Sequence, residues 1–469
     1  MAVVLGIDLG ISGARAAVFR DDGQLLGRGS VLAMQRFAGE SRRERSVADW
    51  FQLVVETVRQ AHAAAENCKI DCVGVGALGP CPVLIDDKLQ PLTGAPLFSL
   101  DGGAEAFRQS LKEKHRIPDY LLGPDHVLPR LALWAAERPD AIRAARYVVD
   151  ATGFLVAQLT GRAVMDHATT VDHCCAGLKQ VVPLPEILKA DAVAGGLTSA
   201  AARRLGLAAG TPVTVGTYDS FADLAGAGVL ADGDRGLLLG STVVIGRISK
   251  KPPTPAAAAK AGLRITPHAG EGSFVGGWTS TSGTALNWAR VEFGQGTQHP
   301  QMPGASGLLA LPYLAGERAP IWDIDARGAL LGFTLETDKQ HLATAMTEGV
   351  VLSILDIASR LDGLTSVASG YRVSGGGLRN KVWADAMADA LGVPLEVMEN
   401  AGEAIGPAAL AFRALGVDRK ARIARVIKPD RKRHARYQEL LRIYRTLYPA
   451  LKTAMHDLGR LAKEDQEHA

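Results

Sequence analysis

The chain has 469 residues, of which 47% are hydrophobic and 22% charged, and its formal net charge at pH 7 is +3. This length exceeds what one hydrophobic core usually supports, so two domains are expected. The small net charge does not call for nucleic acid or an anionic membrane as a partner. No run approaches the roughly 20 apolar residues of a membrane helix, and no signal peptide opens the chain, so we expect a cytoplasmic protein.

The cysteines also favour the cytoplasm. The chain has Cys68, Cys72, Cys81, Cys174 and Cys175, an odd number whose spacing matches no zinc pattern. We therefore expect reduced thiols. Residues 173–175 form a His-Cys-Cys run that could bind a metal, although reduced thiols are the favoured interpretation.

The first half of the chain alternates between strand and helix patterns. A capping box at residues 46–49 places the beginning of the first helix. Apolar runs predict strands near residues 3–9, 14–20, 24–31, 70–77, 83–85 and 212–216, and helical periodicity predicts helices near residues 50–65, 126–138, 150–160 and 220–230.

The second half begins with a new hairpin at Gly236, so the best domain boundary lies near residue 233. The chain is accordingly divided into an N-terminal domain (1–233), a C-terminal domain (234–450) and a polar tail (451–469). A second capping box at Thr337–Gln340 predicts a helix to about residue 361. The basic segment 418–436 precedes an amphipathic helix, which favours a solvated helix face over a nucleic-acid site.

Two glycine-rich hairpin tips are the first functional candidates. One contains Gly10, Ser12 and Gly13, and the other contains Gly240, Ser241 and Thr242. Without a Cβ, the backbone N–H groups of such tips can approach an anion closely, and a hydroxyl adds a donor. Either tip alone is typical of an ordinary β-hairpin. Two facing tips would clamp a polyphosphate.

Two carboxylates complete the requirements for phosphoryl transfer, which needs phosphate clamps, a divalent metal and a base near the acceptor hydroxyl. Asp8 ends an apolar strand and is the candidate ligand for Mg²⁺. Asp219 follows a buried strand and precedes a helix, so it is the candidate base, with a helix N-cap as the alternative. Gly375, Gly376 and Gly377 follow another strand and are candidates for the adenosine side of a nucleotide.

Taken in order, these motifs resemble the FGGY family of carbohydrate kinases, within the actin-like ATPase superfamily. The resemblance extends to about residue 450 and is greatest to the xylulose kinases of this family. It rests on residues 6–12, 210–213, 216 and 219, 240–242, 312, 316–318, 320, 326–328, 374–377, 383, 406 and 408–409.

The resemblance implies a fold and a reaction. The fold is α/β, with two actin-like (ribonuclease H-like) ATPase domains, each a mixed sheet flanked by helices, and a cleft between them. ATP would donate its γ-phosphoryl group to a sugar hydroxyl, with Asp219 as base and sugar contact. Sugar contacts are also implied for Asp101 and for Pro80 and Cys81, and homodimers are common in similar kinases.

The sugar side departs from the family pattern. Residues 77–82 read Ala-Leu-Gly-Pro-Cys-Pro where typical xylulose kinases carry Met-His-Gly, and Asp101 is followed by two glycines. A ketopentose such as D-xylulose is the expected substrate, with ribulose, erythritol or a glycerol-like polyol as alternatives. Two other interpretations are a catalytically weakened sugar-binding regulator and an ATPase that moves a protein partner. The absence of a separate peptide-binding domain argues against the ATPase.

Overall fold

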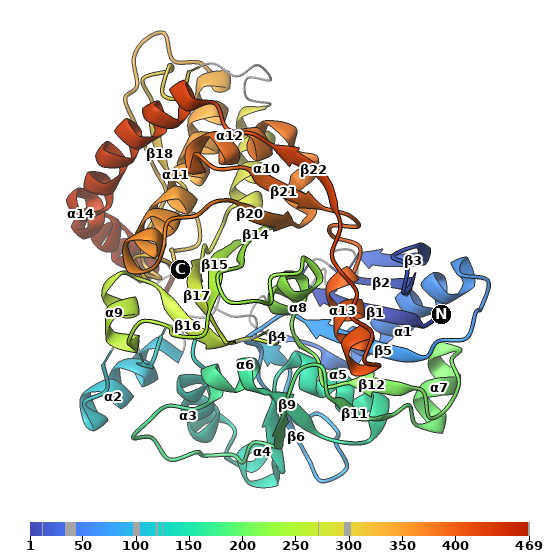
Figure 1. Ribbon diagram of the computed structural model, residues 1–469. Helices are drawn as coiled ribbons and strands as arrows, with labels where there is room; N and C mark the ends of the chain where they lie inside the picture. The colour runs from blue at the N-terminus through green and yellow to red at the C-terminus, as the bar shows by residue number, and fades with distance from the viewer. Residues whose placement is uncertain are drawn as a thin grey trace. The chain divides into compact units, whose positions relative to one another are not determined.

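The computed structural model describes residues 1–11, 13–32, 44–96, 104–118, 121–123, 125–270, 272–294 and 302–467. The chain divides into two compact units, each with a seven-stranded sheet and packed helices (Figure 1). Unit 1 comprises Met1–Leu230, Thr266–Gly272 and Asn400–Ala421, and unit 2 comprises Ala231–Ile265, Ser273–Glu399 and Arg422–Ala469. The predicted α/β class is therefore confirmed.

The sheet of unit 1 is mixed, in the order β11-β12-β5-β1-β2-β3, with β13 paired to β5. Strand β1 pairs antiparallel with β2 and parallel with β5. The strands of this sheet are β1 (Val3–Gly10), β2 (Gly13–Arg20), β3 (Leu25–Leu32), β5 (Cys72–Ala77), β11 (Val193–Gly196), β12 (Pro212–Thr214) and β13 (Thr217–Tyr218). The strand predicted over 212–216 is interrupted before β13, because Gly216 adopts a φ of +74°.

Helices and short strand pairs surround this sheet. The helices of unit 1 are α1 (Val47–Ala64), α2 (Glu105–His115), α3 (Val127–Glu137), α4 (Pro139–Ala144), α5 (Ala151–Thr160), α6 (His167–Thr170), η3 (Val171–His173), α7 (Ser199–Leu205), α8 (Asp219–Gly226) and α13 (Ile405–Ala414). The paired short strands are β4 (Glu44–Arg45) with β7 (Ala95–Pro96), β6 (Val83–Ile85) with β8 (Tyr147–Val149), and β9 (Val164–Asp166) with β10 (Glu186–Leu188). The sequence pattern had assigned the residues of α13 to the second domain.

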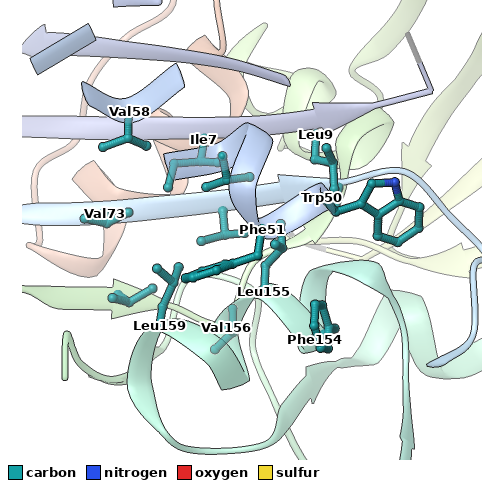
Figure 2. Packing of buried hydrophobic residues seen from close by; sticks show 14 of the residues in the cluster. Ile7, Leu9, Trp50, Phe51, Val58, Val73, Phe154, Leu155, Val156 and Leu159 are labelled. Carbon is teal, nitrogen blue, oxygen red and sulfur yellow. The ribbon is translucent and has the colours of Figure 1, made fainter. Parts of the chain in front are cut away.

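One face of the sheet of unit 1 packs on α1 and α5. Side chains of β1 and β5 meet Trp50 and Phe51 of α1 and Phe154 of α5 there (Figure 2). Ser46 begins α1 as predicted, because its side chain accepts a hydrogen bond from the N–H of Asp49.

The other face of the same sheet packs on α13. Val4 of β1 is buried with Ala404 and Ala408 at the beginning of that helix. A Cβ on Gly6 would lie 2.3 Å from the carbonyl oxygen of Ala404, so only glycine allows this close approach. Side chains alternate along a strand, and Asp8 therefore lies on the same face as Val4 and Gly6.

The sheet of unit 2 has the order β16-β17-β15-β14-β20-β21-β22. Its strands are β14 (Arg235–Leu239), β15 (Val243–Ser249), β16 (Arg264–Pro267), β17 (Ser273–Trp278), β20 (Tyr371–Ser374), β21 (Leu395–Met398) and β22 (Ile423–Ile427). The remaining elements are α9 (Pro255–Lys260), α10 (Gly283–Phe293), β18 (Leu309–Leu311) paired with β19 (Ala329–Leu331), α11 (Lys339–Leu364), η4 (Gly376–Arg379), α12 (Lys381–Leu391) and α14 (Arg431–Glu467). The core of this unit includes the buried side chains of Tyr371 and Trp383.

Two expectations for unit 2 are corrected. The capping box of α11 is formed by Asp338 and His341, one residue later than predicted, because the Asp338 carboxylate accepts from the N–H of His341. The expected polar tail is the continuation of α14, which runs to Glu467 and buries Met455.

Helix α11 is the one described helix that is long and apolar enough to cross a membrane. The most apolar part of this helix is 72% buried within the protein. A core helix has this composition, and α11 supplies many residues of the unit 2 core.

Candidate active site

The first hairpin joins β1 to β2 and carries Asp8 near the end of β1. Gly10 pairs with Gly13 at the tip, and the φ of Gly13 is +147°, which favours glycine. Ser12 lies outside the described residues. Nothing approaches closer than 3.8 Å to a Cβ built on Gly10, so the backbone there is not crowded by protein atoms.

Asp8 forms an ion pair with Arg15, a residue that was not singled out from the sequence. The two residues are direct partners in the β1–β2 register, and Nε of Arg15 lies 3.3 Å from Oδ2 of Asp8. Asp8 is buried, whereas the Arg15 side chain is 39% exposed. Burial raises the pKa of the Asp8 carboxyl, and the positive charge of Arg15 opposes that rise.

Asp219 is the first residue of α8, on the same face of the sheet as Asp8. Asp8 pairs with Gly76 of β5, and a Cβ on Gly76 would lie 3.7 Å from the Cα of Asp219. The N–H of Ser220 donates to Oδ1 of Asp219 over 2.6 Å, which orients the carboxylate. The position at the N-terminus of a helix favours its negative charge.

Asp223 adds a third carboxyl group to this part of unit 1. It lies one helical turn after Asp219 in α8, on the same side of the helix. Burial holds the pKa of Asp223 well above its usual range, and the charges of Asp8 and Asp219 add to this effect while Arg15 opposes it. One guanidinium therefore balances several acidic groups, and the charge of Arg15 is stabilised in return, chiefly by Asp8.

Hard carboxylate oxygens are the ligands that Mg²⁺ prefers, so Asp8 is chemically suited to it. Among the described residues, no group of three or more His, Cys, Asp or Glu side chains is arranged to hold a metal ion by itself. This finding also covers His173, Cys174 and Cys175. All five cysteines are free thiols.

The predicted sugar contacts lie in two places. Asp101 is outside the described residues. Pro80 and Cys81 follow β5 and are both buried, and the N–H of Cys81 donates to Oδ1 of Asp150 over 2.8 Å. Their roles as sugar contacts stay predictions.

The second hairpin lies in unit 2, between β14 and β15. Its tip is attached by backbone hydrogen bonds to the beginning of α10: the N–H of Gly283 donates to the carbonyl of Gly240, and the N–H groups of Ser282 and Thr284 donate to that of Ser241. Ser241 is exposed and Thr242 is partly buried. The hairpin is therefore held in place through its carbonyl groups.

Close packing accounts for two of the three glycines that follow β20. The φ of Gly375 is +105°, and a Cβ there would lie 2.5 Å from the carbonyl oxygen of Leu239. A Cβ on Gly377 would lie 2.3 Å from the ring of Trp383, and Gly376 begins η4. Close packing therefore requires glycine at 375 and 377, and contact with adenosine stays a prediction.

A buried carboxylate supports the segment that holds the second hairpin. Oε1 of Glu317 accepts from the N–H of Ser280 over 2.6 Å and from the N–H of Arg318 over 2.8 Å, while Arg318 donates to the carbonyl of Thr279. The hydroxyl of Thr279 accepts from the N–H of Val243, in the strand that follows the hairpin. Glu317 and Arg318 therefore hold this loop through hydrogen bonds to its backbone groups.

The N-terminal domain of the FGGY family of carbohydrate kinases matches residues 3–226, and the C-terminal domain of this family matches residues 270–415. The chain belongs to the FGGY family of carbohydrate kinases. It is an ATP-dependent carbohydrate kinase, and the resemblance drawn from the sequence is confirmed.

Relatives of this FGGY kinase are named after different substrates. A gluconokinase of Bacillus subtilis is 24% identical over 497 residues, with 95% of this chain and 94% of the relative covered. A xylulose kinase of Staphylococcus epidermidis is 24% identical over 498 residues, with 97% and 98% covered. The ligand-bound crystal structure of a xylulose kinase from Lactobacillus acidophilus has a TM-score of 0.82 at 21% identity, covering 98% of this chain and 100% of that one, which shows the shared fold.

Sequence reasoning missed several residues of this kinase that had a local signal. Arg15 lies opposite Asp8 in a hairpin whose register follows from its short tip, and Asp223 has helical spacing from Asp219. Residues 279–283, which support the second hairpin, read Thr-Ser-Thr-Ser-Gly, a strand-to-helix turn with several hydroxyl groups. Asp150, which accepts from the N–H of Cys81, had no such signal.

Proposed function

We propose that this kinase transfers the γ-phosphoryl group of ATP to a hydroxyl of a ketopentose such as D-xylulose, with Asp219 as general base. The observation that carries the proposal is the pair of carboxylates, Asp8 and Asp219, on one face of the unit 1 sheet beside Arg15. A structural N-cap alone would not explain why Asp8 and Asp223 lie near Asp219, with Arg15 acting on all three.

The proposed reaction assigns one role to each group. The carboxylate of Asp219 accepts the proton of the sugar hydroxyl, whose oxygen forms a bond to the γ-phosphorus. The bond from that phosphorus to the bridging oxygen breaks, and ADP leaves with the electron pair. A positioned base of this kind contributes about 10²- to 10⁴-fold in rate.

The remaining groups bind the nucleotide in this proposal. Backbone and hydroxyl groups of residues 10–13 and 240–242 bind phosphate oxygens, and residues 375–377 lie on the adenosine side. Mg²⁺ held by Asp8 would neutralise phosphate charge, with water and phosphate oxygens completing its coordination. Arg15 balances the negative charge of Asp8 and its acidic neighbours.

A second acceptor class is a sugar acid such as gluconate. The specific observation in its favour is that relatives of nearly full length are named gluconokinase and others xylulose kinase, at the same 24% identity. The sugar-side residues 77–82 also depart from the pattern of typical xylulose kinases. Hydrogen bonds to individual hydroxyl groups discriminate sugars strongly, so changed polar groups change the accepted substrate.

The test measures ADP release from ATP with Mg²⁺ across ketopentoses, ketohexoses, polyols, glycerol and sugar acids. Release that depends on D-xylulose supports the proposal, whereas release that depends on gluconate alone replaces it with the second candidate. Binding of a sugar without turnover would overturn the kinase assignment for this chain and favour a regulator. Equal ADP release with and without every acceptor would favour an ATPase.

A further inference from the structure

A buried polar network lies directly behind the proposed base, and the inference drawn from it rests on the proposed function. Its members are Asp150, Tyr218, His173 and Asp172, all at most 8% exposed. Asp150 caps α5, Tyr218 precedes Asp219 at the beginning of α8, and the other two belong to η3. Most buried polar groups in proteins are hydrogen-bonded, so the partners of these groups restrict where each side chain can lie.

The Asp150 carboxylate connects two segments that are far apart in the sequence. Its Oδ1 accepts from the N–H groups of Cys81 and Ala151, each over 2.8 Å. Its Oδ2 accepts from the hydroxyl of Tyr218 over 3.0 Å. One carboxylate therefore ties the segment after β5, where sugar contacts are expected, to the residue before Asp219.

The ring of Tyr218 lies against the same segment. A Cβ on Gly79 would lie 2.0 Å from Cε1 of Tyr218, so glycine at this position makes room for the ring. Tyr218 is therefore held at both ends of its side chain: the ring rests on Gly79 and the hydroxyl binds Asp150. Because Tyr218 is held in this way, it restricts the movement of the adjacent backbone of Asp219.

Residues 169–173 close the network from the other side. The hydroxyl of Tyr218 also lies 3.3 Å from Oδ2 of Asp172 and 3.4 Å from the carbonyl oxygen of Thr169. Nδ1 of His173 lies 2.9 Å from that same carbonyl, which can only accept, so Nδ1 carries the hydrogen. Nε2 of His173 then faces Oδ2 of Asp150 at 3.8 Å.

We propose that Tyr218 is a positioning residue for Asp219. The Asp150 carboxylate acts through Tyr218 and thereby fixes the position of the base relative to the segment that follows β5. The catalytic carboxylate lies on the adjacent residue, so a shift of the Tyr218 side chain moves Asp219 relative to the acceptor hydroxyl. A misplacement of about 1 Å can reduce a rate about 100-fold. The role is distinct from the proposed nucleotide binding, because no member of the network belongs to residues 10–13, 240–242 or 375–377.

The first variant is Tyr218→Phe, which keeps the ring against Gly79 and removes only the hydroxyl. The expected result is a fall in kcat of between about 10-fold and 100-fold, with the KM for ATP changed by less than about twofold. The matched control is Tyr444→Phe in unit 2, where the lost hydroxyl also donates to a buried partner, the hydroxyl of Tyr313, over 2.9 Å. The control should lose thermal stability and keep its kcat.

The second step is a double-mutant cycle with Asp150→Asn. If Tyr218 acts through Asp150, the loss of kcat in the double variant is smaller than the product of the two single losses. This coupling is a readout that a merely structural role would not produce. Asn at 150 keeps an acceptor for the N–H of Cys81, so the variant is suited to retain the fold.

The outcomes separate the inference from the proposed function. A wild-type protein that phosphorylates no acceptor contradicts the proposed function and, because the inference rests on that function, overturns both. An active wild type whose Tyr218→Phe variant keeps full kcat overturns the inference alone. Equal losses of kcat in the Tyr218→Phe and Tyr444→Phe variants, or independent effects in the cycle, would also overturn it.

Discussion

Asp8 and Arg15 face each other across the first hairpin, with 3.3 Å between Oδ2 and Nε. The pairing follows from the β1–β2 register, in which these residues are direct partners. Because Asp8 is buried while Arg15 is partly exposed, the guanidinium stabilises a carboxylate that would otherwise be costly to bury. The same cation acts on Asp219 and Asp223, so Arg15 contributes to the charge balance of several acidic groups in this part of unit 1.

Substitution Arg15→Gln should destabilise the protein, and more at pH 8 than at pH 5. Burial already raises the pKa of Asp8, and removal of the cation raises it further, so the folded state binds a proton more tightly than the unfolded state. Stability is then lost as pH rises through the folded pKa. Since Arg15 is more than a third exposed, we expect a penalty of about 1–2 kcal/mol at pH 8.

Urea unfolding of the Arg15→Gln variant and of the wild type at both pH values measures this penalty. Arg20→Gln is a suitable control, because Arg20 is a partly exposed β2 residue whose ion pair with Asp22 lies at the surface. An equal penalty at pH 5 and pH 8 would contradict the assigned role of Arg15.

Substitution Asp219→Asn should reduce sugar-dependent ADP release by about 10²- to 10⁴-fold, because the amide cannot accept the proton of the hydroxyl. The side chain keeps an oxygen that can accept from the N–H of Ser220, so the melting temperature should change little. Steady-state kinetics and thermal unfolding measure the two effects. A variant with near wild-type kcat would show that Asp219 is a helix cap and not the base.

The unfolding free energy of the Glu317→Gln variant, relative to that of the wild type, should increase as pH rises from about 5 to about 8. Burial raises the pKa of Glu317 to about 7, although the N–H groups of Ser280 and Arg318 donate to it. This carboxyl therefore binds more protons in the folded state than in the unfolded state between its unfolded pKa and pH 7, and wild-type stability is lost over that range. This pKa shift of Glu317 corresponds to a loss of at most about 3 kcal/mol in the unfolding free energy of the wild type.

Denaturant unfolding of the wild type and the Glu317→Gln variant across this pH range tests the linkage. A difference in unfolding free energy that does not change with pH would show that Glu317 stays ionised in the folded protein.

Substitution Gly74→Ala should destabilise unit 1 by about 3 kcal/mol or more, because overpacking against fixed backbone is poorly tolerated. A Cβ at residue 74 would lie 1.8 Å from the carbonyl oxygen of Pro407, so α13 would have to move away from β5. The matched control is Gly363→Ala in α11, where nothing lies within 4 Å of the added Cβ. Alanine is the better helix former, so the control should gain up to about 1 kcal/mol.

Thermal unfolding of both glycine variants compares these positions directly. Similar melting temperatures for the two variants would show that α13 does not pack tightly on β5 in solution.

Much of the fold could be predicted because its signals are local. The strand pattern of residues 3–9 and 14–20 and the tip between them predicted the first hairpin, and Ser46 predicted the beginning of α1. The capping box of α11 was misplaced by one residue, because Thr337, Asp338 and the residues after them offer two similar patterns. The long-range position of α13 could not be predicted, because its contacts with β1 and β5 join segments more than 300 residues apart.

The sequence by itself determined the family of this protein, its α/β class and the order of its two glycine-rich hairpins, since hydrophobic alternation, glycine positions and motif order are properties of the linear chain. Only the tertiary structure decided that Asp8 and Asp219 share one face of a sheet, that Arg15 balances several carboxyl groups, and that Asp150 connects Tyr218 to Cys81. These relationships depend on which strands pair and which faces are buried. The physical reason is that burial and charge balance arise from groups brought together by packing, and no single segment contains them.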